Sequence, residues 1–224
     1  MTAHPTGWTV IVPVKPWRLA KSRLQLDRGA REALARAFAL DVIAALSDAV
    51  AVETIVLVSA EEDLRRAARG LGVELLADRP LRSLDPLNDA VATGRHWAAQ
   101  RRPAAPAAAL VSDLPTLTGE AVTTALALAA DHRASFIPDA GGSGTTMVAS
   151  TEPGSLVTAF GPASARRHAE LGLLSLFEAD ARIRRDVDDT THLEAADALG
   201  LGRHTQDVVT SLLLRQSRPR RSLA

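Results

Sequence analysis

Four cationic side chains crowd one short segment of this 224-residue chain, and two of them are its only lysines, Lys15 and Lys21. Arg18 and Arg23 complete the group, and the segment follows an apolar run that ends at Val14. Lysine carries a compact, mobile ammonium that binds phosphate as a point charge, and several cations together suit a triphosphate. The P-loop pattern G-x-x-x-x-G-K-[ST] is absent. The segment predicts a polyphosphate site, with a chance pairing of two lysines in an arginine-rich chain as the alternative.

Carboxylates occur at two places, far apart in the sequence, where they could hold a divalent cation. Asp113 lies in V-S-D-L-P, directly after a predicted strand, and Asp186 and Asp188 lie in R-D-V-D-D-T. On an extended segment the last two side chains point to the same side. Carboxylates hold Mg²⁺ against bound phosphates, so the three aspartates are candidate metal ligands. The alternatives are a capping or turn aspartate at the first place and a solvated acidic turn at the second.

Two further motifs could bind an anion. Residues 139–146 read D-A-G-G-S-G-T-T, and the glycines permit either a close approach of backbone N–H groups to a ligand or a simple hairpin turn. Residues 160–168 read F-G-P-A-S-A-R-R-H, in which Ser164 is predicted to cap a helix whose N-terminus faces an anion. His168 either touches that ligand or is packed or solvated. Asn88 either hydrogen-bonds a base or ribose or caps a helix.

Composition excludes several classes of protein. Zero net charge and a pI near 7.0 argue against a general nucleic-acid binder, which usually has a basic excess. The chain has no cysteine, and so no disulfide framework, thiolate nucleophile or cysteine-ligated zinc. No apolar run approaches the roughly 20 residues of a membrane span, and the N-terminus lacks a signal pattern. We therefore expect a soluble, cytoplasmic protein that binds neither nucleic acid nor membrane.

Short apolar runs alternate with longer amphipathic stretches. The predicted strands are Thr9–Val14, Thr54–Ser59, Val73–Ala77, Ala107–Ser112, Ala134–Pro138 and Thr145–Ala149. The predicted helices are Ala30–Ala49, Glu61–Gly70, Pro86–Gln100 and Thr118–Ala130. This alternation predicts an α/β fold with a mainly parallel, doubly wound sheet, whose ligands bind beyond the carboxyl ends of the strands. We expect one domain over residues 1–214 and a disordered basic tail over residues 215–224.

The order of these motifs resembles that of a known family. The chain carries, between residues 9 and 193, P-V-K-x-x-x-x-A-K-S-R-L, L-N, D-L-P, G-T-T, F-G-x-x-S-x-x-x-H and D-V-D. In this it is similar to the phosphoenolpyruvate or 2-phospho-L-lactate guanylyltransferases of coenzyme F420 biosynthesis. The resemblance implies a single-domain, Rossmann-like nucleotidyltransferase of three α/β/α layers that uses GTP and Mg²⁺.

The resemblance also implies a role for each matching residue. The implied roles are nucleotide binding for Lys15, Lys21, Arg23 and Asn88, metal binding for Asp113, Asp186 and Asp188, acid binding for Thr146, Gly161 and Ser164, and catalysis for Lys15, Lys21 and Asp113. The substrate's phosphate would attack the α-phosphorus of GTP and release pyrophosphate, which requires positioning and charge neutralisation rather than a nucleophilic side chain. The implied partners are GTP and a phosphorylated three-carbon acid, with a functional link to the downstream F420 transferase.

The acidic motif departs from the family's pattern. The family commonly continues D-V-D-T-P-x-D-L, whereas this chain reads D-V-D-D-T-T-H-L. The departure leaves open which of Asp186, Asp188 and Asp189 binds metal. Other functions also stay open: a 3-phosphoglycerate guanylyltransferase, a nucleotidyltransferase that makes another nucleotide conjugate, and a catalytically silent nucleotide-binding regulator. The sequence does not indicate an oligomeric state.

Overall fold

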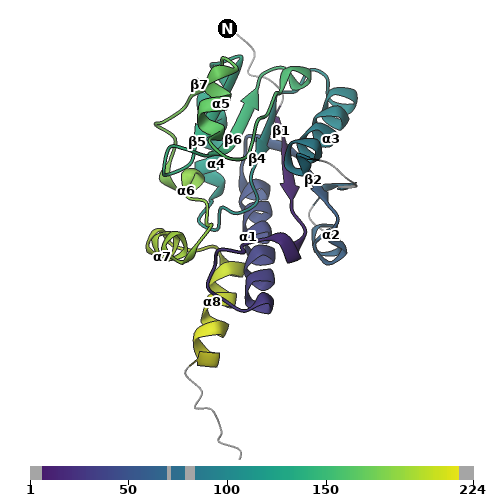
Figure 1. The fold of residues 1–224 in the computed structure, drawn as a ribbon. Helices are drawn as coiled ribbons and strands as arrows, with labels where there is room; N and C mark the ends of the chain where they lie inside the picture. The colour runs from purple at the N-terminus through teal and green to yellow at the C-terminus, as the bar shows by residue number, and fades with distance from the viewer. Residues whose placement is uncertain (1–6, 70–71, 79–83, 217–224) are drawn as a thin grey trace, which may run out of the picture.

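The computed structural model describes residues 7–69, 72–78 and 84–216, which form one sheet with helices on both faces (Figure 1). The strands are β1 Trp8–Val14, β2 Val52–Ser59, β3 Glu74–Ala77, β4 Ala107–Leu110, β5 Ala134–Pro138, β6 Thr145–Ser150 and β7 Leu174–Ser175. Within the described residues their order in the sheet is β3-β2-β1-β4-β6-β5-β7. Neighbouring strands pair in parallel except at β6, which runs antiparallel to both β4 and β5.

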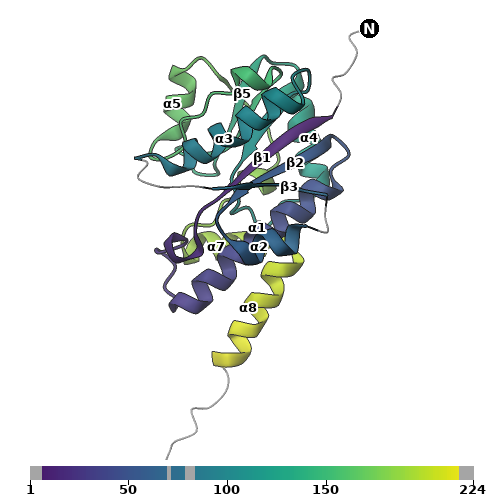
Figure 2. The same cartoon turned by 90° about the vertical axis from the view of Figure 1, so that its right-hand side faces the viewer.

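Helices cover both faces of this sheet. The α-helices are α1 Arg28–Asp48, α2 Glu62–Ala68, α3 Pro86–Arg101, α4 Gly119–Ala130, α5 Ser164–Glu170, α6 Ala181–Arg184, α7 Thr190–Leu199 and α8 Arg203–Gln216, and two 3₁₀ helices span Trp17–Leu19 and Pro153–Ser155. α3 and α5 pack on one face, and α1 and α4 pack on the other (Figure 2). α6 packs on the same face as α1 and α4. α8 packs along α1 and extends away from the sheet.

The central strand β1 is buried on both sides, as expected of a parallel strand between two helical layers. Val10, Val12 and Val14 pack with α1 and α4 in one core, whereas Ile11 packs with α3 in the other. This alternation follows from the two-residue period of a strand. Lys15 is the first residue after β1, so the strand delivers it to the carboxyl edge of the sheet.

The predicted fold class is confirmed, since the six predicted strands and four predicted helices are all present with ends that differ by a few residues. The sequence does not predict β7, because two residues are too short to show an alternating pattern. Residues 215 and 216 of the predicted tail belong to α8, and residues 217–224 lie outside the described residues. None of the described helices has the length and apolar character needed to cross a membrane.

Gly94 marks a very close approach between α3 and β1. A Cβ atom there would overlap the side chain of Ile11, which is fully buried. We expect Gly94→Ala to lower the free energy of unfolding by about 1–3 kcal/mol, because overpacking outweighs a gain in helix propensity of about 1 kcal/mol. Urea unfolding measures this change. Gly154→Ala is the control, since no neighbouring atom lies within 4 Å of a Cβ there, and equal losses in both variants would contradict the prediction.

Candidate functional site

A cavity of about 540 Å³ lies beyond the carboxyl ends of β1 and β4, where ligands of such sheets bind. Most of the predicted site residues line it, namely Lys15, Lys21, Arg23, Asp113, Gly161, Ser164, Asp186 and Asp188. Asn88 and Thr146 are not among the lining residues. The fold therefore brings cations from the start of the chain to carboxylates from its middle and end.

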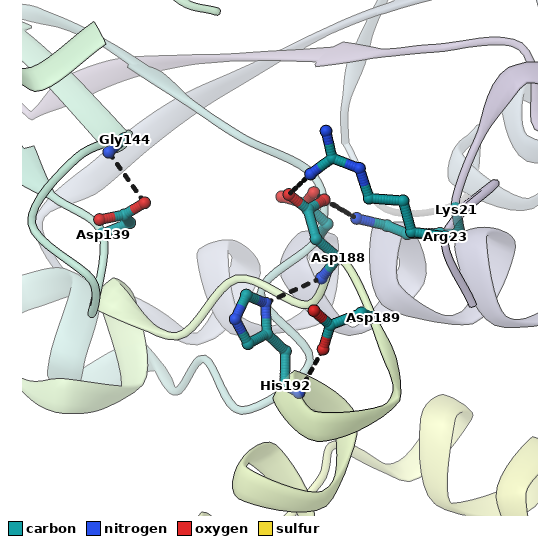
Figure 3. Close-up of polar contacts among 8 residues, drawn as sticks. Lys21, Arg23, Asp139, Gly144, Asp188, Asp189 and His192 are labelled. Atoms are coloured by element: carbon teal, nitrogen blue, oxygen red, sulfur yellow. Dashed lines mark hydrogen bonds and ion pairs between the residues drawn. The ribbon is translucent and has the colours of Figure 1, made fainter. Parts of the chain in front are cut away.

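The ammonium of Lys21 contacts two of the predicted metal ligands, Asp113 and Asp188, the second of which is labelled in Figure 3. Its Nζ is 2.5 Å from Asp113 Oδ2 and 3.4 Å from Asp188 Oδ1, and the side chain is only 8% exposed. Burial alone would lower the pKa of Lys21, but the charge and hydrogen bond of Asp113, followed by the charge of Asp188, raise it above its ordinary value. Lys21 therefore stays charged near neutral pH. Arg23 is largely exposed, and its Nη1 lies 4.0 Å from Asp188 Oδ2.

A small apolar cluster holds these charged segments in place. Leu24 and Val187 are buried in one cluster with Phe38 of α1. The N–H of Val187 also donates to the carbonyl of Asp113 at 3.1 Å. Because Val187 points into the cluster, the aspartates on either side of it are turned toward the cavity. Lys21 lies three residues before Leu24 and is anchored by the same cluster.

Carboxylates outnumber the buried cation at this end of the cavity. Burial, followed by the charges of Asp113, Asp188 and Asp139, raises the pKa of Asp186 to about 7. Asp113 Oδ1 is buried and has no hydrogen-bond partner among the described residues. Several carboxylates close together, and the buried Asp113 Oδ1 that has no partner among the described residues, suit a hard divalent cation such as Mg²⁺, which prefers oxygen ligands. However, no three acidic or histidine side chains within the described residues are already arranged around a common metal position.

The altered part of the acidic motif starts a helix. Asp189 is the N-cap of α7, and its Oδ1 accepts a hydrogen bond from the N–H of His192 at 2.9 Å (Figure 3). His192 Nδ1 in turn accepts from the N–H of Asp188 at 3.4 Å. Asp189 does not line the cavity, whereas Asp186 and Asp188 do. The departure from the family's pattern therefore affects the start of α7, and the first two aspartates of the motif face the cavity.

The glycine-rich loop closes on its own carboxylate. Asp139 accepts hydrogen bonds from the N–H groups of Ser143 at 3.0 Å and Gly144 at 2.9 Å, the second of which is drawn in Figure 3. These two N–H groups are therefore not free to bind an anion, and of the two alternatives for this motif the structure shows the hairpin turn. Thr145 lines the cavity. Thr146 is buried away from the cavity, and its hydroxyl donates to a carbonyl of β5 at 3.4 Å.

His168 supports the site from within the core. The N–H of Ala159 donates to His168 Nε2 at 2.8 Å, so the proton of the neutral ring lies on Nδ1 and is donated to Thr145 Oγ1 at 2.9 Å. The ring centroid lies 5.6 Å from that of Phe136 and 5.5 Å from that of Phe160. Of the alternatives for His168, the structure shows the packed histidine.

Asn88 fixes the loop before α5. Its Nδ2 donates to the carbonyl of Phe160 and its Oδ1 accepts from the N–H of the same residue, both at 3.0 Å. Arg167 also donates to this carbonyl, at 2.9 Å. Gly161 follows with φ of +121°, and a Cβ atom there would lie 2.9 Å from Arg167 Nη2, so the position favours glycine. Asn88 thus contacts the loop rather than the cavity, and its nucleotide role stays a prediction.

The prediction that Ser164 caps a helix is wrong. Ala163 occupies the cap position in the left-handed region, with φ of +52°, and makes no side-chain capping bond. Ser164 is instead the first residue of α5 and is buried where it lines the cavity. The cause is the turn that begins at Gly161, which brings the chain into the helix without a capping side chain.

Sequence reasoning misses three residues at the site. Asp139 and Thr145 lie within the glycine-rich motif, but their approach to the cavity depends on the tertiary fold. Asp78 follows β3 and lines a second cavity of about 210 Å³, which shares Lys15 and Leu87 with the first. Its position directly after a strand is the same signal that identifies Asp113.

The buried His168 predicts a pH dependence of stability. Burial, followed by the charge of Arg167, lowers the pKa of His168 from 6.5 to about 4. Between these values the unfolded chain binds a proton that the folded chain does not, so His168 contributes a loss of about 2–4 kcal/mol as the pH decreases from about 6.5 to about 4. The raised pKa of Asp186 contributes in the opposite direction over the same range, so the loss is measured as the difference in the free energy of unfolding between the wild type and His168→Gln, by urea unfolding of the metal-free proteins at several pH values. A difference that does not change with pH would contradict the assignment.

Comparison with known families and curated proteins identifies relatives over almost the whole chain. The family described as "Guanylyl transferase CofC like" matches residues 8–211. The phosphoenolpyruvate guanylyltransferase of Streptomyces coelicolor is 39% identical over 92% of this chain and 98% of its own length. The enzyme of the same name from Thermomonospora curvata is 38% identical over 88% of this chain and 86% of its own length.

Solved structures with low sequence identity share the fold. A nucleotidyl transferase from Methanothermobacter matches with a TM-score of 0.57 at 14% identity, over 86% of this chain and 97% of its own. Rv0371c of Mycobacterium tuberculosis in complex with manganese matches with a TM-score of 0.52 at 16% identity, over 85% of this chain and 98% of its own. The family match over residues 8–211 shows that this chain belongs to the CofC-like guanylyltransferase family.

Proposed function

We propose that this chain transfers GMP from GTP to the phosphate of phosphoenolpyruvate and releases pyrophosphate, in the cytoplasm and as a step of coenzyme F420 synthesis. The observation that carries the proposal is the buried Lys21 ammonium between Asp113 and Asp188, with Lys15 and Arg23 lining the same cavity. This arrangement offers cations to a triphosphate and acids to a divalent cation. The names of the Streptomyces and Thermomonospora relatives support phosphoenolpyruvate as the acceptor.

In the proposed reaction a phosphate oxygen of the acid attacks the α-phosphorus of GTP. A new P–O bond forms while the bond from the α-phosphorus to the oxygen that bridges to the β-phosphorus breaks, and pyrophosphate leaves with that electron pair. The attacking oxygen is already anionic and needs no general base, which agrees with a cavity whose lining residues include no histidine. Lys15, Lys21 and Arg23 neutralise the charge that develops on the departing pyrophosphate.

Asp113, Asp186 and Asp188 are the residues that would hold Mg²⁺. When bound, the ion would neutralise phosphate charge and help to align the reacting groups. The manganese in the Mycobacterium tuberculosis neighbour supports the use of a divalent cation. The buried oxygen of Asp113 that has no partner among the described residues is the donor that most requires such an ion.

The acid is proposed to bind against Thr145, Gly161 and Ser164. Because Thr145 Oγ1 accepts the Nδ1 proton of His168, the hydroxyl's own hydrogen is free to donate into the cavity. A phosphate or carboxylate oxygen is a suitable acceptor. We therefore assign a hydroxyl contact with the acid to Thr145, next to the backbone around Thr146 for which the resemblance implies acid binding.

The guanine base is proposed to enter the smaller cavity. Its walls are mainly apolar and include Pro13, Pro86, Leu87 and Ala90, and Asp78 is the only carboxylate among its lining residues. Burial, followed by the charge of a neighbouring aspartate, raises the pKa of Asp78 above its usual range. An ionised carboxylate there would accept hydrogen bonds from N1–H and the 2-amino group of guanine, donors that adenine does not offer together.

Replacement of Asp78 tests this assignment. Asp78→Asn is expected to shift the preference from GTP towards xanthosine triphosphate. The ratio of kcat/KM for xanthosine triphosphate to kcat/KM for GTP should rise by about 100-fold, because the amide of asparagine can donate to the O2 atom of xanthine. Asp131→Asn, an exposed aspartate that lines neither cavity, is the control and should leave the ratio unchanged. A ratio unaltered in both variants would show that Asp78 does not bind the base.

A substrate panel tests the overall proposal. Pyrophosphate release is measured with Mg²⁺, GTP and, in turn, phosphoenolpyruvate, 2-phospho-L-lactate and 3-phosphoglycerate, and phosphoenolpyruvate is expected to react fastest. Asp113→Asn should lower the rate by about 100-fold or more while the protein still unfolds cooperatively.

Other outcomes of the panel identify the alternatives. Faster turnover of 3-phosphoglycerate would assign the other acid, and turnover only with a different nucleotide or acceptor would indicate another conjugate. GTP binding without pyrophosphate release from any acid would favour a catalytically silent regulator.

A further inference from the structure

Lys21 occupies the space that a divalent cation would need. A cation that bridges Asp113 and Asp188 must lie within bonding distance of an oxygen from each, and Nζ already lies 2.5 Å and 3.4 Å from such oxygens. The ammonium is enclosed rather than solvated, since the Lys21 side chain is only 8% exposed and its Nζ lies 5.9 Å from the centroid of the Phe38 ring. A metal ion and this ammonium therefore cannot bind the two carboxylates in the same way at the same time.

We propose that Lys21 is a built-in counter-ion that excludes divalent cations from Asp113 and Asp188 until a nucleotide triphosphate draws the ammonium away. This rests on the proposed function, in which Lys21 binds the triphosphate. Before a nucleotide binds, the ammonium neutralises part of the charge of the two carboxylates. When phosphates enter the cavity, the ammonium moves to them and the carboxylates become free for the metal. Metal binding is thus made dependent on the nucleotide.

The geometry favours exchange over a permanent ion pair. Lys21 leaves Asp113 Oδ1 buried without a partner among the described residues, so one ammonium does not satisfy this carboxylate. The carboxylate of Asp186 lines the same space and makes no hydrogen bond to Lys21 among the described residues. A divalent cation with several ligands would satisfy both, whereas the triphosphate offers Lys21 an alternative set of anionic oxygens.

The backbone of Lys21 is also held in an unusual conformation. Its φ of +55° lies in the left-handed region, which non-glycine residues seldom adopt without support from surrounding contacts. The contacts of the side chain with Asp113 and Asp188 provide such support. Release of the ammonium would remove that support, so the segment can rearrange around the incoming phosphates.

Binding of Mn²⁺ to the nucleotide-free protein tests the proposal without any turnover. Free Mn²⁺ is measured by electron paramagnetic resonance for the wild type and for Lys21→Met, which keeps an unbranched chain but lacks the charge. Lys21→Met is expected to bind Mn²⁺ at least about tenfold more tightly than the wild type does, because two carboxylates then face the ion without a competing cation. The gain should be lost in the double variant Lys21→Met/Asp113→Asn. Equal affinities of the wild type and Lys21→Met would overturn the proposal.

Lys15→Met is the matched control. Lys15 lines the same cavity but forms no ion pair within the described residues, so its replacement removes an equal charge without opening the carboxylate pair. Its Mn²⁺ affinity should change far less than that of Lys21→Met. Similar gains in both variants would indicate a general effect of charge and would contradict a specific block by Lys21.

A measurement on the wild type covers the case in which Lys21→Met does not fold. Because the chain has only two lysines, ¹⁵N-lysine labelling gives two side-chain ammonium signals. Addition of a non-hydrolysable GTP analogue without metal should shift the Lys21 signal, whereas Mg²⁺ alone should leave it unchanged. Either of two results would contradict the proposal. A shift of the Lys21 signal with Mg²⁺ alone would show that the ion displaces the ammonium without a nucleotide, and the absence of a shift with the analogue would show that the nucleotide does not draw the ammonium away. Failure of the substrate panel would refute the proposed reaction but leave these results interpretable.

Discussion

Repulsion between carboxylates at the carboxyl edge of the sheet is the constraint on which the arrangement of the site depends. Asp113, Asp139, Asp186 and Asp188 approach one another closely enough to perturb the protonation of Asp186. Two of these segments are fixed by backbone contacts: Asp139 is bound by its own loop, and the segment around Val187 is bound to Asp113. Lys21 contributes the buried cation, and it is attached through a flexible side chain. The negative charge is therefore held rigidly and the compensating charge is movable.

The scaffold makes this possible by burying apolar residues between the charged ones. Leu24, Phe38 and Val187 come from three distant parts of the sequence and meet in one cluster beside the cavity. α8 contributes to the same cluster, and its start is tied to α1 because the buried Asp41 accepts hydrogen bonds from the backbone of His204 and Thr205, both at 2.9 Å. The C-terminal helices thus stabilise the position of the segment that carries Asp186 and Asp188, even though their residues do not line the cavity.

Patterns of local sequence predict the strands and helices well here, because each apolar run is bounded by polar or glycine-rich segments. Most of the site residues predicted from the same patterns line the cavity, since Lys15 and Asp113 follow strands of the sheet. They fail where tertiary contacts decide. Asn88 and His168 hold the loop around Phe160, and no local signal distinguishes such supporting residues from ligands. A positive φ at a non-glycine residue, as at Ala163, is equally invisible in the sequence.

The reversed direction of β6 has a consequence for how the two substrates are recognised. Because β6 runs against β4 and β5, its first residue, Thr145, reaches the edge at which the parallel strands end. The proposed acid contacts therefore belong to the β5–β6 hairpin and the loop before α5, whereas Lys15 and Asp78 belong to the β1–β3 half of the sheet. On these proposed assignments, the two substrates are recognised by separate parts of one sheet. Evolution or protein engineering can therefore alter acceptor preference through the hairpin while the nucleotide half is inherited unchanged.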